Sequence, residues 1–220
     1  MRSIKIFGKN IEFNLPSEAD ESVFEEVFVD LDYKKVDEII KKATTVILDI
    51  GAHIGCFSVY CSILNPVVPV VAFEPESKNF LLLKEHLKIN RAKNVRPKNL
   101  AVAGSDGVGK LFISDDSHNH SLIAGGNGDV MPVNITTLDR ALSSFEECDL
   151  VKMDCEGAEV EIFNNVSTSA LVKVQNFYIE YHMKDKVAEM VKILQSNGFK
   201  TNVVTSRYDN NMGFIFASRT

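Results

Sequence analysis

Short apolar segments alternate with amphipathic segments along most of this chain. The continuous apolar runs predict buried strands at Val46–Ile50, Val67–Phe73, Leu150–Met153 and Phe177–Tyr181. Apolar residues at helical spacing predict helices over Gly55–Leu64, Ser77–Asn90, Ala158–Asn164 and Lys184–Ser196, with Ser77 as N-cap and Gly198 as a C-cap. Apolar strands between amphipathic helices are typical of a mostly parallel sheet covered on both faces. The pattern therefore predicts a doubly wound α/β fold.

The two ends of the chain carry different patterns. Ile4–Phe7 and Ile11–Leu15 predict a hairpin, and helical spacing over Glu18–Ala43 predicts helices with a break near Asp30–Asp32. The closing segments Phe199–Thr205 and Gly213–Ala217 are joined by a turn-rich stretch, which predicts a terminal antiparallel hairpin.

The middle of the chain is less regular. A strand is expected near Val95–Asn99 or Leu100–Ala103, and Lys110–Ser114 with Val130–Ile135 predict a strand pair. The Gly-rich loop Asp115–Asp129 between them, with His118 and His120, is interpreted as a substrate lid or a simple loop. We expect residues 1–44 to form an extension packed on a core of residues 45–220, within a single domain overall.

Composition narrows the class of protein. The chain has 220 residues, of which 45% are hydrophobic, so it can bury one sizeable core. No apolar run approaches the roughly 20 residues that span a bilayer, and the first residues soon turn polar, unlike a signal peptide. Four cysteines without metal-type spacing predict reduced, mostly buried thiols: Cys56, Cys61, Cys148 and Cys155. We therefore expect a cytoplasmic protein.

Charge argues against nucleic acid as a partner. The net charge is −6, whereas phosphate binding depends on Lys and Arg. One basic group crowds a predicted helix end, where it is interpreted as a solvated face or, less favoured, as an anionic-substrate patch: Lys84, Lys88, Arg91, Lys93, Arg96 and Lys98. There is also no Asn/Asp-Pro-Pro-aromatic sequence of the type associated with methylation of base amino groups.

A glycine turn carries the first functional signal. Gly51 follows the first core strand directly, and Gly55 opens the next helix. Small residues there let a ligand approach backbone N–H groups at the positive end of a helix. Asp49 ends the strand, and Glu74 lies 23 positions after Gly51. That offset is close to the one at which an acidic residue binds ribose hydroxyls.

The same turn discriminates between two cofactors. An NAD enzyme needs a turn of the GxGxxG type for its pyrophosphate, whereas this turn contains His53 and follows Asp49. A carboxylate repels a pyrophosphate and attracts an α-amino group. The turn therefore favours a nucleoside that carries an amino acid.

Further segments occur in order with this turn and reinforce each other. They are Ala72-Phe73-Glu74-Pro75, Thr137-Leu138-Asp139, Asp149-Leu150-Val151-Lys152-Met153-Asp154-Cys155-Glu156-Gly157-Ala158-Glu159 and Glu180-Tyr181-His182. Together they closely resemble the FkbM family of class I S-adenosylmethionine (SAM)-dependent methyltransferases, from about Val46 to His182. The resemblance implies a seven-stranded Rossmann-like sheet with an antiparallel last strand and SAM as cofactor.

The resemblance also implies a set of cofactor-binding residues. These are Asp49, Gly51, Ala52 and Gly55 for the methionine and ribose portion, Glu74 for the ribose hydroxyls, Asn99 and Ala101 near the adenine, and His53 and Pro75 as further cofactor-binding residues of the same segments. Two positions depart from the family pattern: His53 stands where Asn is frequent, and Asn99 stands near the position of a frequent Asp.

The candidate catalytic residues follow two strands. Asp154 and Glu156 follow one, Glu180 and His182 end the next, and neighbouring parallel strands would bring all four together. His182 is the favoured base for a hydroxyl proton because of its ordinary pKa, with Asp154 as an alternative base. A divalent metal on these oxygen ligands is a less favoured alternative. Glu156 and Glu159 could instead stabilise a helix start, and Glu180 could pair with Lys152.

By its family resemblance, the chain is expected to be an O-methyltransferase that acts on a hydroxyl of a sugar, glycan, glycolipid or secondary metabolite. The alternatives are an N- or carboxyl-methyltransferase and a SAM- or NAD-binding module without methyl transfer. The sequence does not indicate the acceptor or the oligomeric state.

Overall fold

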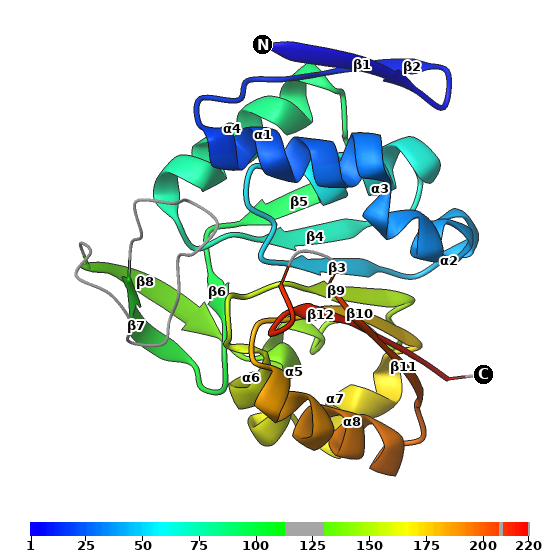
Figure 1. Ribbon diagram of the computed structural model, residues 1–220, viewed down its shortest axis with the longest axis vertical. Helices are drawn as coiled ribbons and strands as arrows, with labels where there is room; N and C mark the ends of the chain where they lie inside the picture. The colour runs from blue at the N-terminus through cyan, green and yellow to red at the C-terminus, as the bar shows by residue number, and fades with distance from the viewer. Residues whose placement is uncertain (113–129, 207–208, 220) are drawn as a thin grey trace.

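The computed structural model describes residues 1–112, 130–206 and 209–219. Its centre is a seven-stranded sheet with the strand order β11-β12-β10-β9-β3-β4-β5 (Figure 1). The strands are β3 (Ile47–Ile50), β4 (Val70–Phe73), β5 (Val95–Lys98), β9 (Leu150–Met153), β10 (Asn176–Tyr181), β11 (Lys200–Thr205) and β12 (Gly213–Ser218). Only β12 runs antiparallel to its two neighbours, β10 and β11. The predicted sheet with its antiparallel last strand is confirmed.

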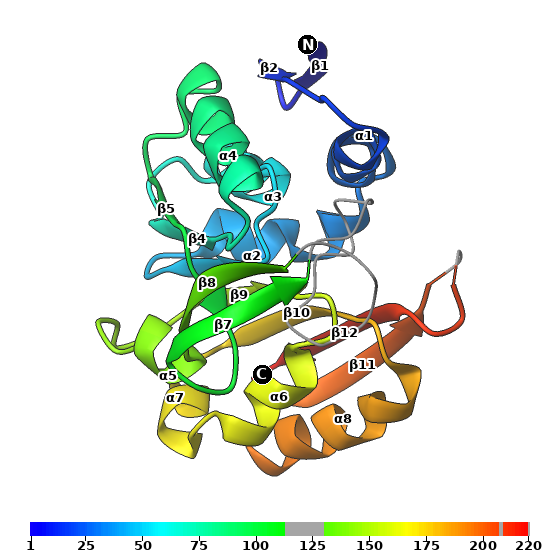
Figure 2. The ribbon, with the colours of Figure 1, turned by 90° about the vertical axis from the view of Figure 1, so that its left-hand side faces the viewer.

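Helices cover both faces of this sheet (Figures 1 and 2). One face carries α2 (Asp37–Lys42), α3 (Cys56–Leu64) and α4 (Ser77–Ile89). The other carries α5 (Leu138–Ala141), α6 (Glu159–Asn165), α7 (Thr168–Lys173) and α8 (Val187–Ser196), the last preceded by the short turn Lys184–Lys186. Along β3, Ile47 packs into the first core while Leu48 and Ile50 pack into the second. This alternation explains why the strand is apolar throughout.

The N-terminal residues pack into the first core. The hairpin β1 (Arg2–Ile6) and β2 (Lys9–Phe13) precedes α1 (Glu18–Glu25), the π-helical turn η1 (Glu26–Asp30) and the 3₁₀ turn η2 (Asp32–Val36). Phe13, Phe24 and Phe28 are buried and join the residues of α3 and α4. Leu31 adopts a φ of 57°, which breaks the helix where the sequence predicted a break.

A separate three-stranded sheet stands beside the main one. It consists of β6 (Ala101–Val102), β7 (Gly107–Phe112) and β8 (Val130–Thr136), in the order β6-β8-β7. Both alternatives for the irregular middle region therefore form strands, β5 in the large sheet and β6 in the small one. The predicted lid Asp115–Asp129, with His118 and His120, lies outside the described residues.

Two local predictions were wrong. The strand predicted over Val67–Phe73 begins only at Val70, after Pro69. The N-cap of α4 is Glu76 and not Ser77, because the Glu76 carboxylate accepts the N–H of Asn79 at 2.6 Å. Ser77 is therefore the first residue of the helix and not its cap. Among the described residues, no helix has the length and apolar character needed to cross a bilayer.

The order of the strands places the site. The chain passes from β3 outward through β4 to β5, then returns to form β9 and β10 on the other side of β3. The direction of winding therefore reverses between β3 and β9. In open parallel sheets, ligands bind beyond the carboxyl ends of the strands at such a point.

Candidate functional site

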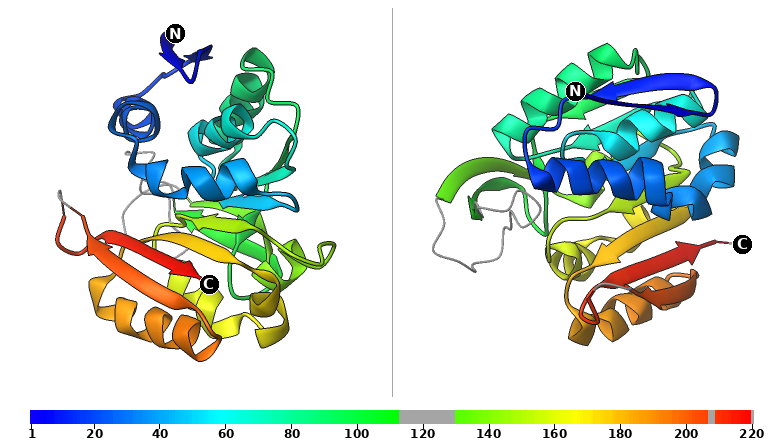
Figure 3. Two further views of the ribbon diagram at one scale, coloured as in Figure 1. Left: turned by 90° about the vertical axis from the view of Figure 1, so that its right-hand side faces the viewer. Right: turned by 45° about the horizontal axis from the view of Figure 1, so that its top comes forward.

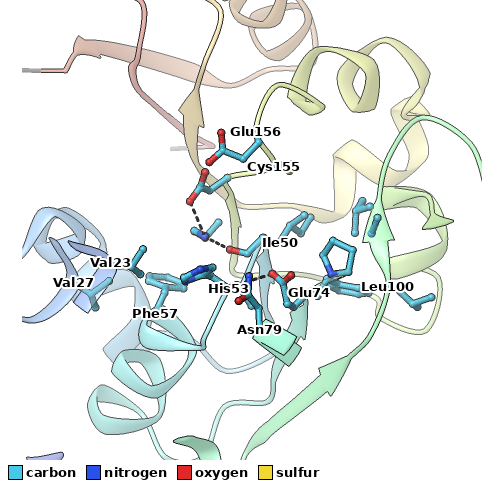
Figure 4. A pocket seen from close by; sticks show the side chains of 18 of the residues that line it. Val23, Val27, Ile50, His53, Phe57, Glu74, Asn79, Leu100, Cys155 and Glu156 are labelled. Carbon is cyan, nitrogen blue, oxygen red and sulfur yellow. Dashed lines mark hydrogen bonds and ion pairs between the residues drawn. The ribbon is translucent and has the colours of Figure 1, made fainter. Parts of the chain in front are cut away.

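A pocket opens at the carboxyl ends of β3, β4 and β9. Its walls are mostly apolar, with acidic groups at Glu26, Glu74, Asp154 and Glu156. Figure 4 shows Val23 and Val27 on one side and Leu100 on the other, with Glu74 and Asn79 between them. The N-terminal helical segment therefore supplies one wall of a pocket whose floor is the sheet.

The glycine turn brings two strand ends together. Gly51 has a φ of 74°, and a Cβ there would lie 1.7 Å from the carbonyl oxygen of Asp154. Only glycine permits that approach. The N–H groups of Gly51 and Ala52 bond to the carbonyl of Phe73 at 3.1 and 2.9 Å. The turn was expected to offer these donors to a ligand, but they tie β3 to β4.

Glu74 lies on the pocket wall where the sequence placed an acidic residue. It is 5% exposed, and its carboxylate accepts the N–H groups of His53 and Glu76, each at 2.8 Å. Burial raises the pKa of Glu74 to about 8, although these two hydrogen bonds act in the opposite direction. Pro75 and Ala101 also line the pocket.

Asp49 faces a buried lysine. The carboxylate is fully buried, accepts the Ser58 hydroxyl at 2.6 Å and lies 3.5 Å from Nζ of Lys152. The same ammonium donates to the carbonyl of Gly51 at 2.7 Å and lies 3.5 Å from Asp154. Asp49 is not among the residues that line the pocket. The expected direct contact with a cofactor amino group is therefore replaced by an internal ion pair that holds the turn.

Two other predicted cofactor residues have structural contacts. A Cβ on Gly55 would lie 2.4 Å from Cδ1 of Leu83, so this glycine lets α3 pack on α4. The Asn99 amide donates to the carbonyls of Glu74 and Pro75, both at 2.9 Å, and does not line the pocket. Its neighbours Leu100, Ala101 and Val102 line the pocket in its place.

The two strand ends meet, and Asp154, Glu156 and His182 lie together as predicted, whereas Glu180 is not part of this group and lines a second cavity. Nε2 of His182 lies 3.6 Å from Asp154 and 3.4 Å from Glu156, and Nδ1 lies 3.3 Å from Glu159. Burial lowers the pKa of His182, but the hydrogen bond to Glu159 and the charges of Asp154 and Glu156 together raise it to about 10. Asp154, Glu156 and His182 are also close enough to hold a metal ion.

Glu156 joins this group with its backbone in the left-handed region. Its φ is 53°, and burial with the nearby charge of Asp154 raises its pKa to about 8. Glu159, which could have served only as a helix-start charge, accepts the N–H of Cys155 at 2.8 Å as well as contacting His182. Lys152 pairs with Asp49 and Asp154, so the proposed pairing with Glu180 is not the one observed.

Sequence reasoning missed several pocket residues. The most informative is Glu26, which lines both this pocket and a second cavity that also contains Glu180. Its signal in the sequence was an acidic residue within the apolar helical face formed by Val23 and Val27. Tyr33 and Asn79 also line the pocket, and their side chains reach it only because distant elements fold together.

The pocket fits SAM. Glu74 offers a carboxylate suited to ribose hydroxyls, and the apolar side chains of Phe73, Leu100 and Val102 form a surface for a flat base. Gly51 leaves room where a side chain would fill the space beside β9.

Comparison with known proteins decides the family. The Methyltransferase FkbM domain matches residues 49–201. The chain belongs to the FkbM methyltransferase family. It is a methyltransferase domain whose cofactor is SAM.

Relatives of this FkbM domain occur in different contexts. AMB antimetabolite synthetase AmbE of Pseudomonas aeruginosa is 24% identical over 83% of this chain, which spans only 11% of AmbE. Methyltransferase 1 of Beauveria bassiana is 22% identical, over 83% of this chain and 82% of that protein. Among solved structures, the N-terminal domain of EvdMO1, determined in the presence of SAH and D-fucose, has a TM-score of 0.54 at 13% identity, covering 87% of this chain and 82% of that one. This likeness shows the shared fold.

Proposed function

We propose that this FkbM domain transfers the methyl group of SAM to a hydroxyl oxygen. The acceptor class is a sugar, glycan, glycolipid or hydroxylated secondary metabolite. The observation that carries this proposal is the group Asp154, Glu156 and His182 at the edge of the SAM pocket. A hydroxyl must lose a proton to become a good nucleophile, and this group can accept one. The presence of D-fucose with EvdMO1 is consistent with such an acceptor.

The roles of the residues follow from their positions. SAM, when bound, supplies an electrophilic methyl group. Glu74 holds the ribose hydroxyls and Leu100 packs against the base, so both fix the cofactor. The cluster around His182 receives the proton of the acceptor hydroxyl. Alignment of acceptor and donor supplies most of the rate acceleration, because the displacement itself needs no covalent help from the protein.

An acceptor screen with labelled SAM tests the proposal. Hydroxylated, amine-bearing and carboxylate-bearing compounds are incubated with the protein, and mass spectrometry assigns the methylated atom. We expect the products to be O-methyl ethers. The Glu74→Ala variant should form none when the SAM concentration is far below the dissociation constant of that variant for SAM. Products methylated only on nitrogen or carboxyl oxygen would contradict the proposal.

Chelation tests whether a metal ion assists removal of the proton from the acceptor hydroxyl. Protonated His182 already supplies positive charge to Asp154, Glu156 and Glu159. We therefore expect turnover to persist after treatment with EDTA and dialysis. Loss of turnover that Mg²⁺ restores would instead assign a divalent ion to this cluster.

A further inference from the structure

A second cavity lies next to the SAM pocket. It has a volume of about 760 Å³ and is lined by residues of the N-terminal helical segment, of β10 and of the β11–β12 hairpin. Figures 2 and 3 show the blue N-terminal helices and the red-orange β11–β12 hairpin on the same side of the molecule. The volume lies in the range of pockets that hold small organic ligands.

Glu26 connects the two cavities. It lines both of them, and its Oε1 atom is buried without a hydrogen-bond partner among the described residues. Asp154, Lys152 and Asp32 lie near the carboxylate, and the Tyr33 hydroxyl hydrogen-bonds to it, which leaves Oε1 as the oxygen open to a ligand. A buried carboxylate oxygen without a donor is unfavourable, so this atom is suited to receive a hydrogen bond from a ligand.

The second cavity is acidic. Among the described residues that line it, five are carboxylates and two are lysines: Glu25, Glu26, Asp30, Asp32 and Glu180 against Lys34 and Lys35. Within this group, Glu26 lies close enough to Glu180 for its charge to add to the burial that raises the pKa of Glu180. An anionic ligand that enters this cavity meets repulsion, whereas a neutral or cationic one does not.

We propose that this cavity is the acceptor site, that Glu26 accepts a hydrogen bond from a second, non-reacting hydroxyl of the acceptor where the cavity meets the SAM pocket, and that the acceptor is a neutral or cationic polyhydroxylated compound. The inference rests on the proposed function for the reacting group. Glu180, expected from the sequence to belong to the catalytic cluster, lines this cavity and contacts the acceptor there. An amino sugar or a neutral glycoside fits this site better than a uronic acid or a sugar phosphate.

Three matched probes test the charge preference. Methyl glucoside, methyl glucosaminide and methyl glucuronide share one ring and differ in charge. Their dissociation constants are measured by ligand-observed NMR with the full chain loaded with S-adenosylhomocysteine. We expect the glucosaminide to bind most tightly and the glucuronide most weakly. Tightest binding of the glucuronide, or no binding by any probe, would overturn the proposal.

Glu26→Gln tests the contact itself. The glutamine keeps the shape but removes the charge, so we expect binding of the neutral and cationic probes to fall by about tenfold or more. Glu38→Gln is the matched control, since Glu38 is exposed, pairs with Lys41 and lines neither cavity. Far-UV circular dichroism and cooperative thermal unfolding of both variants show that they fold. Equal probe binding by Glu26→Gln and Glu38→Gln would remove Glu26 from the site.

A second variant tests the charge of the cavity without changing Glu26. Asp30 is exposed and lines only the second cavity. Asp30→Lys should reduce the preference for the glucosaminide over the glucuronide by about twofold or more, because it reverses one charge near the ligand. An unchanged preference would contradict the proposed acceptor site.

The acceptor screen keeps the two proposals apart. If methylation occurs only on nitrogen, the proposed O-methylation fails, while the probes and Glu26→Gln still decide the second cavity. If O-methyl products form and probe binding ignores Glu26, the proposed function stands and the acceptor site is wrong.

Discussion

Individual carboxylates in this protein owe their chemistry to burial. Glu74 is buried and Glu156 and Glu26 are partly buried, and burial is the largest cause that raises the pKa of each, to about 8, 8 and 7. The groups that offset the cost of burying each carboxylate differ. Glu74 has two backbone N–H donors, Glu156 has His182, and Glu26 has the Lys152 charge. Three glutamates of the same site therefore differ in the groups that stabilise their carboxylates.

Glu74 is the residue on which SAM affinity should depend most. Glu74→Ala is expected to weaken SAM binding by about 1–3 kcal/mol, the range for loss of charge-assisted hydrogen bonds. Calorimetry with SAM measures it. Because Glu74 also holds the backbone of His53 and Glu76, Glu74→Gln is the companion variant that keeps the side chain's shape. Affinity unchanged in both variants would exclude Glu74 from the cofactor site.

His182 should control turnover and its pH dependence. Its pKa of about 10 means that the imidazole is protonated at neutral pH and can accept an acceptor proton only after losing its own. We expect turnover to rise with pH toward about 10. His182→Gln should bind SAM normally, turn over more slowly and lose this rise. A variant with full activity and the parent pH profile would show that His182 is not the base.

At the scale of elements, glycines set how closely strands and helices approach. Gly51 allows β3 to meet β9, and Gly55 allows α3 to pack on α4. The obstacle differs: the carbonyl oxygen of Asp154 belongs to the backbone, whereas the Cδ1 atom of Leu83 ends a flexible side chain. Backbone cannot move aside without disturbing the sheet.

A series of alanine substitutions at glycines should separate the cost of a positive φ angle from the cost of a steric clash at Cβ. Gly8, Gly55 and Gly51 all have positive φ angles, of 76°, 90° and 74°, but a Cβ on Gly8 meets nothing within 4 Å. We expect Gly8→Ala to cost about 1 kcal/mol of unfolding free energy, from conformational strain alone. Gly55→Ala should cost more, and Gly51→Ala at least about 3 kcal/mol. Urea unfolding measures the series, and equal losses at Gly8 and Gly51 would contradict the role assigned to the β3–β9 approach.

At the scale of the whole molecule, the site gathers segments from the entire chain. Glu26, Glu74, Asp154 and Glu180 come from four elements, and the sheet brings their carboxylates around the same two cavities. The positive charges that oppose them are few: Lys152 is buried between Asp49 and Asp154, and His182 lies among three carboxylates. The protein therefore maintains a concentration of acidic groups at its site, and burial keeps several of them partly protonated near neutral pH.

This concentration predicts how stability depends on pH. A group whose pKa is higher in the folded than in the unfolded protein stabilises the fold below its unfolded pKa and loses that contribution as the pH rises through the folded value. Burial raises the pKa of Glu74 from 4.5 to about 8 and that of Glu26 from 4.5 to about 7. Without ligand, the melting temperature should therefore fall between about pH 5 and pH 8.

The control for this prediction is the double variant Glu26→Gln, Glu74→Gln. Its melting temperature should depend less steeply on pH over the same interval, because the two side chains no longer titrate. Differential scanning fluorimetry in matched buffers compares the two proteins. A parent protein that becomes more stable from pH 5 to pH 8 would contradict the assigned direction of these pKa shifts.

The sequence by itself determined the sheet, its helices and the order of the strand ends. Apolar runs of strand length and apolar residues at helical spacing are local properties, and the family motifs are contiguous. The positions of Gly51, Glu74, Asp154 and His182 at the carboxyl edge followed from that pattern together with the family resemblance, which implies that the strands are neighbours. Errors stayed local, such as the N-cap at Ser77 in place of Glu76, since adjacent polar residues compete for the same backbone donors.

Only the tertiary structure decided what each of these side chains contacts. Asp49 faces Lys152 across two neighbouring strands, and Asn99 bonds to the backbone at Glu74 and Pro75. Glu26 reaches the site because the N-terminal segment folds back over the sheet. Local sequence patterns do not predict this packing. Burial and neighbouring charge depend on segments far apart in the chain, which is why the sequence indicates the chemical groups at this site and the fold determines their charge and their partners.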